Sequence, residues 1–122
     1  MATIYHDAQD IYMLKSELNS LTISVENENE NENEHSGYFI FNDAKLVGPN
    51  KPGEIYKGAD CVDNWITVVA VIKDRLAETN WTSLSIFFKE EGERSVTFGP
   101  YRREVEQHLD TIVYTIKIKI KE

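Results

Sequence analysis

The residue types that most often carry out chemistry are few and scattered in this sequence. The three histidines, His6, His35 and His108, lie far apart, and none has another ligand residue at a spacing typical of a metal site. His35 and Ser36 follow a glutamate-rich stretch and could hold a divalent ion weakly, whereas His108 is expected on the surface of a helix. We therefore predict no metal site and no cofactor.

Cys61, the only cysteine, is expected near the start of a helix, where the helix dipole could lower the pKa of its thiol. A lone cysteine in such a place is more often a small packing residue, and no histidine lies near it in the sequence. The chain has no P-loop, G-x-S-x-G or G-x-G-x-x-G segment, and no pair of its many carboxylates stands out as an acid and a base. We predict no catalytic residue and no enzymatic activity.

Length and composition indicate one globular domain that spans residues 1–122. Apolar residues make up 41% of the chain and aromatic residues 11%, enough for a hydrophobic core. No apolar run approaches the length of a transmembrane helix, and residues 1–10 do not resemble a secretory signal. The single cysteine fits a reducing compartment, so we expect a cytoplasmic protein without membrane contact.

The net charge of −8 is concentrated in the first half of the chain. Residues 1–66 contain four Lys or Arg and twelve Asp or Glu, whereas residues 67–122 contain nine of each kind. An acidic field repels phosphate, so nucleic acid is not an expected partner, but the same field attracts a basic protein. The alternative is that the acidic surface serves only solubility.

Glu and Asn alternate without interruption from Glu26 to Glu34. The repeat lies between residues 21–25, whose apolar and polar side chains alternate as in a half-buried strand, and the aromatic run at 38–41. We interpret the two runs as paired strands and residues 26–35 as a mobile hairpin tip.

Three helices are predicted. Residues 8–19 carry Ile11, Leu14 and Leu18 at helical spacing after Asp7, a possible N-cap. Residues 60–79 repeat apolar side chains at intervals of 4, 3 and 4 from Trp65, although the β-branched run at 67–72 could also form a buried strand. A third helix is expected from Gly99-Pro100 to about residue 110.

A second hairpin is predicted from residues 81–89 and 94–98, which flank an acidic turn. A terminal strand is predicted after residue 110, although a helical period competes with the strand alternation across residues 111–120. Its lysines, Lys117, Lys119 and Lys121, would lie on the solvated face. Residues 42–59 are rich in Gly and Pro and predict a long surface loop, a common place for contacts with a partner. The residues expected to bind the partner lie in or next to this loop: Asp43, Glu54, Tyr56, Asp60 and Asp63.

The predicted fold class is therefore α+β. The expected order α-β-β-α-β-β-α(-β) describes a two-layer domain, with a mostly antiparallel sheet and helices on one face.

Two stretches resemble the YezG-like antitoxins. Residues 21–43 combine a strand, a polar turn that ends in Ser36-Gly37, and the aromatic strand at 38–41. Residues 80–88 contain Trp81-Thr82-Ser83 and precede an acidic turn, which is similar to the second hairpin of that family. The resemblance covers residues 5–110. It implies an immunity protein that binds and neutralises a cognate toxin, often a nuclease, and it supplies no catalytic residues.

The leading hypothesis is thus an immunity protein whose partner is a basic toxin. One alternative is a phage-type inhibitor or DNA mimic that acts on a host nuclease. Another is an adaptor subunit whose terminal strand, at residues 115–121, pairs with the sheet of another protein. The sequence does not indicate the oligomeric state.

Overall fold

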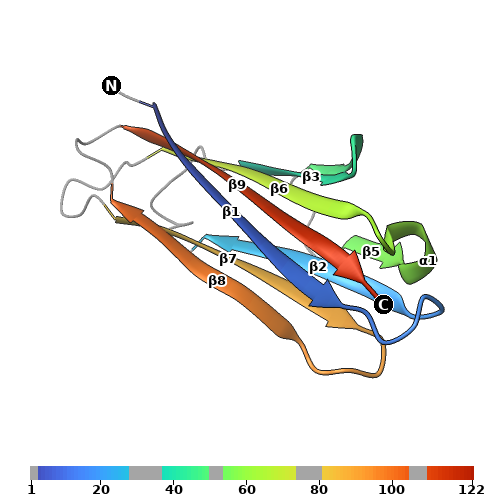
Figure 1. The fold of residues 1–122 in the computed structure, drawn as a ribbon. Coiled ribbons are helices and arrows are strands. Elements are labelled where there is room, and N and C mark those ends of the chain that lie inside the picture. Colours follow the sequence, from blue (N-terminus) through green and yellow to red (C-terminus); the bar gives the residue numbers. More distant parts are fainter. Residues whose placement is uncertain (1–2, 28–36, 50–53, 74–80, 105–109) are drawn as a thin grey trace.

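A computed structural model shows the protein as two β-sheets packed face to face (Figure 1). The structure describes residues 3–27, 37–49, 54–73, 81–104 and 110–122. Within these residues there is one short helix, and no helix is long and apolar enough to cross a membrane. The elements are β1 (Thr3–Met13), β2 (Ser20–Asn27), β3 (Gly37–Asn42), β4 (Lys45–Pro49), β5 (Glu54–Lys57), α1 (Gly58–Cys61), β6 (Trp65–Lys73), β7 (Trp81–Glu90), β8 (Val96–Glu104) and β9 (Thr111–Lys121).

One sheet has five strands in the order β1-β9-β6-β3-β4, and the other has four in the order β5-β2-β7-β8. Strands β1 and β9 pair in parallel over their full lengths, from Thr3 opposite Thr111 to Met13 opposite Lys121. The other pairs are antiparallel. Figure 1 shows β9, in red, between β1 and β6.

The core lies between the two sheets and follows from the alternation of side chains along each strand. In β6 and β9, every second residue is buried. In β9 these residues are Tyr114 and four isoleucines, Ile112, Ile116, Ile118 and Ile120. Tyr114 and Thr82 share a hydrogen bond of 2.7 Å between their hydroxyl groups, which joins β9 to β7 across the sandwich. Aromatic contacts continue the core toward the end of β1, where the rings of Tyr12 and Phe88 lie 5.2 Å apart.

The predicted α+β fold is wrong, because the described residues are almost entirely β. In place of the helix expected at 60–79, the structure has the end of α1 followed by β6. Residues 74–80 lie outside the described residues. The buried side chains of β6 are Ile66, Val68, Ala70 and Ile72, a period of two. The apparent helical spacing of Trp65, Val69 and Ile72 is coincidental, and the preference of β-branched residues for strands decides the structure.

The other two predicted helices are also wrong. Residues 8–13 belong to β1, which begins before the expected N-cap Asp7, and the expected apolar stripe does not share one face. Leu14 is buried, whereas Ile11 and Leu18 are exposed. The segment expected to form the third helix begins inside β8, which continues through Gly99-Pro100 to Glu104, and residues 105–109 lie outside the described residues.

Strands β2 and β3 confirm the strands expected at 21–25 and 38–41, but they do not form a hairpin. β2 pairs with β5 and β7, and β3 pairs with β4 and β6, so the two strands belong to different sheets. The first dipeptide of the Glu-Asn repeat, Glu26-Asn27, belongs to β2 rather than to a mobile tip, and the rest of the repeat lies in the connection between the two sheets. Residues 28–36 are outside the described residues.

The segment at 42–59 is not a loop throughout, since β4, β5 and the start of α1 all lie in it. Gly48 and Pro49 are compatible with β4 because this strand is short and lies at a sheet edge. The terminal strand is confirmed as β9. Its proposed use as a free edge is wrong, because β9 has β1 on one side and β6 on the other.

The second hairpin is confirmed, with β7 antiparallel to β8. Gly99 and Pro100 do not end β8, because they coincide with an irregularity in the pairing between Leu84 and Ile86. Gly99 has a φ of 96°, and a Cβ atom there would lie 2.7 Å from the backbone nitrogen of Tyr101. Glycine is therefore required at this bend of an edge strand.

A buried carboxylate fixes the connection between β1 and β2. Glu90, at the end of β7, is 0% exposed. Its oxygens accept hydrogen bonds from the Tyr12 hydroxyl at 3.0 Å, the Lys15 N–H at 2.9 Å, the Ser16 N–H at 3.2 Å and the side-chain amide of Asn19. Burial raises the pKa of Glu90, but the hydrogen bonds outweigh it and hold the pKa below its ordinary value.

Replacement Glu90→Gln is expected to lower the free energy of unfolding by about 1.5–3 kcal/mol near neutral pH, the usual value of hydrogen bonds to a charged group. Because the pKa of Glu90 is lower in the folded state, its stabilisation is complete above the ordinary carboxyl pKa and is lost as the pH falls through the folded-state pKa. Urea unfolding between about pH 7 and pH 3 should show the difference between wild type and variant shrinking in acid. The exposed Glu104→Gln serves as a control, and a difference independent of pH would contradict this role.

Candidate interaction surface

The outer face of the five-stranded sheet carries the side chains that alternate with the core residues. In β6 these are residues 65, 67, 69, 71 and 73, and in β9 they are residues 111, 113, 115, 117, 119 and 121. The pairing of β3 with β6 puts Phe39 opposite Val69 and Phe41 opposite Thr67, so both phenylalanines lie on this outer face. No described helix covers it (Figure 1).

Aromatic and aliphatic side chains gather on the β3–β4 half of this face. Phe39 is 44% exposed, and Leu46, opposite Phe41 in β4, is 50% exposed. Val69 and Val71 are half-buried in the neighbouring strand. We call this set the apolar band: Phe39, Phe41, Leu46, Trp65, Val69, Val71 and Val113. Large exposed apolar groups that are contiguous across strands are typical of surfaces that bind other molecules.

Trp65, at the end of the apolar band, is held in place by a neighbouring strand. The Nζ atom of Lys119 in β9 lies 5.5 Å from the centroid of the Trp65 ring, within the range of a cation–π interaction. The same Nζ atom donates a hydrogen bond to the backbone carbonyl of Asp63. Trp65 is therefore ordered before any partner binds, which lowers the entropy cost of using it as a contact.

Three of the predicted contact residues, Asp43, Asp60 and Asp63, meet near α1 and the start of β6. The backbone carbonyl of Asp60 accepts hydrogen bonds from the amides of Asn42 at 2.8 Å and Asn64 at 3.2 Å. These bonds join the β3–β4 turn to α1, and we call the three aspartates the acidic corner. It adjoins the apolar band at Trp65.

The three aspartates differ in their roles. The carboxylate of Asp43 accepts the Trp65 N–H at 2.9 Å, while its own N–H donates to the Trp65 carbonyl at 2.8 Å, so Asp43 mainly fixes the local backbone. Asp60 and Asp63 have exposed side chains. Asp43 and Asp63 have φ values of 51° and 66°, a conformation that aspartate tolerates better than most residues. Asp60 and Asp63 thus hold their carboxylates at the surface of the acidic corner.

The remaining predicted contact residues lie in β5, in the other sheet. Glu54 pairs with Ile23 and Tyr56 with Leu21. Tyr56 is half-buried and packs against the core, which was the alternative to a contact role. The structure therefore separates Glu54 and Tyr56 from the acidic corner by assigning them to the four-stranded sheet.

Residues with catalytic potential do not come together in the described part of the chain. Cys61 is the last residue of α1 rather than its first, and it is fully buried. Burial and the nearby charge of Asp60 raise the pKa of its thiol to about 11. His6 lies against Tyr114, with ring centroids 5.2 Å apart, and His35 and His108 are outside the described residues. No group of three or more His, Cys, Asp or Glu that could hold a metal occurs among the described positions.

The apolar band was not expected from the sequence. Trp65 and Val69 were assigned to the buried stripe of a helix, and Leu46 to a loop. The signal that could have found the band is the period of two at 65–73, whose odd-numbered residues are too apolar for a solvated face.

No protein-family model, curated protein or solved structure matches this chain.

Cys61 is expected to be inert in the native protein, because its thiol is buried and its pKa is raised. Reaction with a disulfide reagent near pH 8 should be at least about a hundredfold slower for the native protein than for the urea-unfolded chain. A native rate close to the unfolded one would contradict the burial of the thiol and would reopen a nucleophilic role for Cys61.

Proposed function

We propose that this protein works by binding another protein through the outer face of its five-stranded sheet, and that it acts as an immunity protein that neutralises a basic toxin. The observation that carries the proposal is the apolar band next to the acidic corner. Protein interfaces commonly combine a central group of aromatic and aliphatic anchors with a polar rim.

The rigidity of the surface supports a binding role. The band is built on paired strands, with Phe39 opposite Val69 and Phe41 opposite both Thr67 and Leu46. Cross-strand neighbours restrict one another's rotamers, so little side-chain freedom is left to be lost on binding. Such a surface can hold a partner tightly without a change in its own fold.

The charge supports a basic partner. The chain has a net charge of −8, and Asp60 and Asp63 place exposed carboxylates beside the anchors. Acidic groups at the rim of an interface accelerate encounter with a basic protein and add less to the final affinity. Enzymes that cleave nucleic acids need basic surfaces to bind phosphate, so a nuclease toxin is a partner of suitable charge.

Neutralisation by this route needs no reaction centre, because covering the partner's substrate-binding surface is sufficient. This agrees with the state of Cys61, the one described cysteine, which is buried and has a raised pKa. Inhibition by occlusion makes a simple requirement: each toxin molecule must be bound, and the complex must persist longer than the toxin needs to act.

The first test is titration calorimetry against the toxin encoded beside this protein, together with a growth assay of toxin and protein expressed in one cell. We expect one-to-one binding that abolishes toxicity. Phe39→Ala should weaken binding by about 2 kcal/mol or more, about 30-fold, as for an anchor at the centre of an interface. Leu18→Ala is the matched control, because Leu18 is 89% exposed but lies outside the sheet face. Equal effects of the two variants, or no binding, would overturn the proposal.

The acidic corner makes a separate prediction about rates. The double variant Asp60→Asn, Asp63→Asn should lower the association rate constant at low salt and weaken its dependence on salt, while the dissociation rate changes little. Asparagine also tolerates the positive φ of Asp63, so the fold should be kept. Stopped-flow measurements can compare it with Glu91→Gln, Glu104→Gln, which has the same charge change in the β7–β8 hairpin. A loss of rate in the control alone would exclude the acidic corner from the interface.

A further inference from the structure

The outer edge of β1 is the least protected sheet edge in the described structure. The three other edge strands carry familiar devices against pairing with another sheet. β4 and β5 are short, β4 contains Pro49 next to an irregular register, and β8 contains Pro100, Arg102 and Arg103. β1 extends over 11 residues with no Gly, Pro, Lys or Arg, and its regular pairing with β9 shows no bulge.

The backbone of β1 directs one set of hydrogen-bonding groups away from β9. The Leu14 N–H donates to the carbonyl of Lys121 at the end of β9, whereas the Ile11 N–H donates to the carboxylate of the adjacent Asp10 at 3.0 Å. Successive residues of a strand present their N–H and C=O groups to opposite sides. The odd-numbered residues from Thr3 to Met13 therefore face the free edge.

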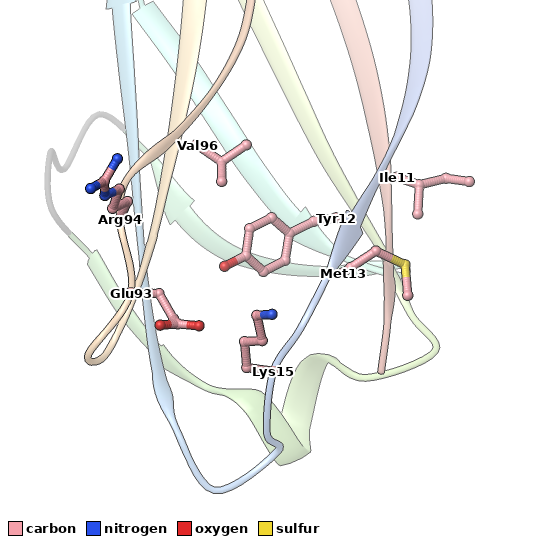
Figure 2. Close-up of a pocket in the computed structure, with 7 residues that line it drawn as sticks. All are labelled: Ile11, Tyr12, Met13, Lys15, Glu93, Arg94 and Val96. Atoms are coloured by element: carbon pink, nitrogen blue, oxygen red, sulfur yellow. The ribbon is translucent and has the colours of Figure 1, made fainter.

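The surface is hollowed along this edge. One cleft, of about 470 Å³, lies between the end of β1 and the β7–β8 hairpin. It is lined by Ile11, Tyr12, Met13 and Lys15 on one side and by Glu93, Arg94 and Val96 on the other. Figure 2 shows Tyr12 pointing to one side of the strand and Ile11 and Met13 to the other. A cleft that touches both faces of a strand must follow its backbone edge. A second hollow, of about 390 Å³, lies on the outer face over β1 and its neighbour β9, where it is lined by Tyr5, Asp7, Ala8, Gln9, Thr115 and Lys117.

We propose that a second copy of this chain occupies the edge, with the two β1 strands antiparallel about a two-fold axis at Ala8. Ala8 is the midpoint of β1, so this register pairs all of its residues and no other symmetric register does so. The result is a continuous ten-stranded sheet across the two copies.

The sequence of β1 is complementary to itself in this register. On the outer face, Tyr5 lies opposite Ile11 of the second copy, an aromatic and β-branched pair of the kind that stabilises sheets. On the inner face, His6 lies opposite Asp10 of the second copy. A shift of the axis to Asp7 or to Asp10 instead places two equal negative charges opposite each other, which is unfavourable.

The exposed apolar side chains of β1 gain partners in the dimer. Tyr5, Ile11 and Met13 are 67%, 52% and 60% exposed in the single chain. Pairing places a strand of the second copy beside them at the free edge. In the dimer, the Ile11 N–H donates its hydrogen bond to a carbonyl of the second copy instead of to the Asp10 carboxylate. The Asp10 carboxylate can then contact His6 of the second copy.

Sedimentation velocity of the full chain from about 1 to 200 µM tests the proposal. The wild type should show a reversible monomer–dimer equilibrium, and Ile11→Lys should weaken it at least about tenfold, because a lysine replaces both Ile11 side chains of the dimer and lysine on an edge opposes pairing. The matched control is Leu18→Lys, since Leu18 is 89% exposed and lies in the connection between β1 and β2, outside both the edge and the apolar band. A monomeric wild type, or equal effects of the two variants, would overturn the dimer.

The register is tested by cross-linking. Ala8 faces Ala8 of the second copy as a pair that is not hydrogen-bonded, with Cα atoms about 4.5 Å apart, which is within the range of a disulfide. Ala8→Cys should form an interchain disulfide on mild oxidation, and the buried Cys61 should not take part. Gln9→Cys is the control, because residue 9 faces residue 7 of the second copy. Preferential cross-linking of Gln9→Cys would overturn the register about Ala8.

Discussion

Strand β9 pairs along its length with two neighbours, parallel to β1 on one side and antiparallel to β6 on the other, and both sheets depend on this position. Its inner side chains, from Ile112 to Ile120, fill the middle of the core. The hydroxyl group of Tyr114 bonds to Thr82 and so ties the five-stranded sheet to β7. A shift of β9 by one residue would turn the isoleucines outward and the lysines inward, so the register of the whole sandwich is fixed here.

The two sheets contribute differently to the molecule. The four-stranded sheet provides Glu90, whose carboxylate holds the connection from β1 to β2 and thereby the end of β1. The five-stranded sheet provides the apolar band on its outer face and an open edge along β1. The two proposed contacts are compatible, because pairing at the edge widens the sheet and leaves the band accessible. Stabilising groups and candidate binding groups thus occupy different parts of one sandwich.

Local patterns predicted those strands whose alternation is strong and whose partners are close in sequence. The β7–β8 hairpin, β9, and the strands β2 and β3 were all visible in this way. β1 was missed because an edge strand exposes much of both faces, so polar residues such as Gln9 and Asp10 interrupt the alternation. β6 was missed because Trp65, Val69 and Ile72 coincide with a helical period. The pairing of β2 with β7 rather than β3 is non-local, and no local pattern encodes it.

The acidic residues of the candidate surface were found by their charge, but the apolar band could be recognised only once β6 was known to be a strand.

The crossing between the sheets has a genetic consequence. β2 ends at Asn27 and β3 begins at Gly37, and all of the Glu-Asn repeat after its first dipeptide lies in the chain between them. Tandem repeats in DNA gain and lose whole units during replication, so this connection is expected to vary among strains in steps of one dipeptide. Each added dipeptide raises the entropic free-energy cost of closing this connection by only about 0.2 kcal/mol. A step of two residues also matches the period of the β-pleat, so a strand that extended into the repeat would keep its inward and outward faces. Replication errors here would change the length of the protein while leaving the inward-facing and outward-facing residues of its strands unchanged.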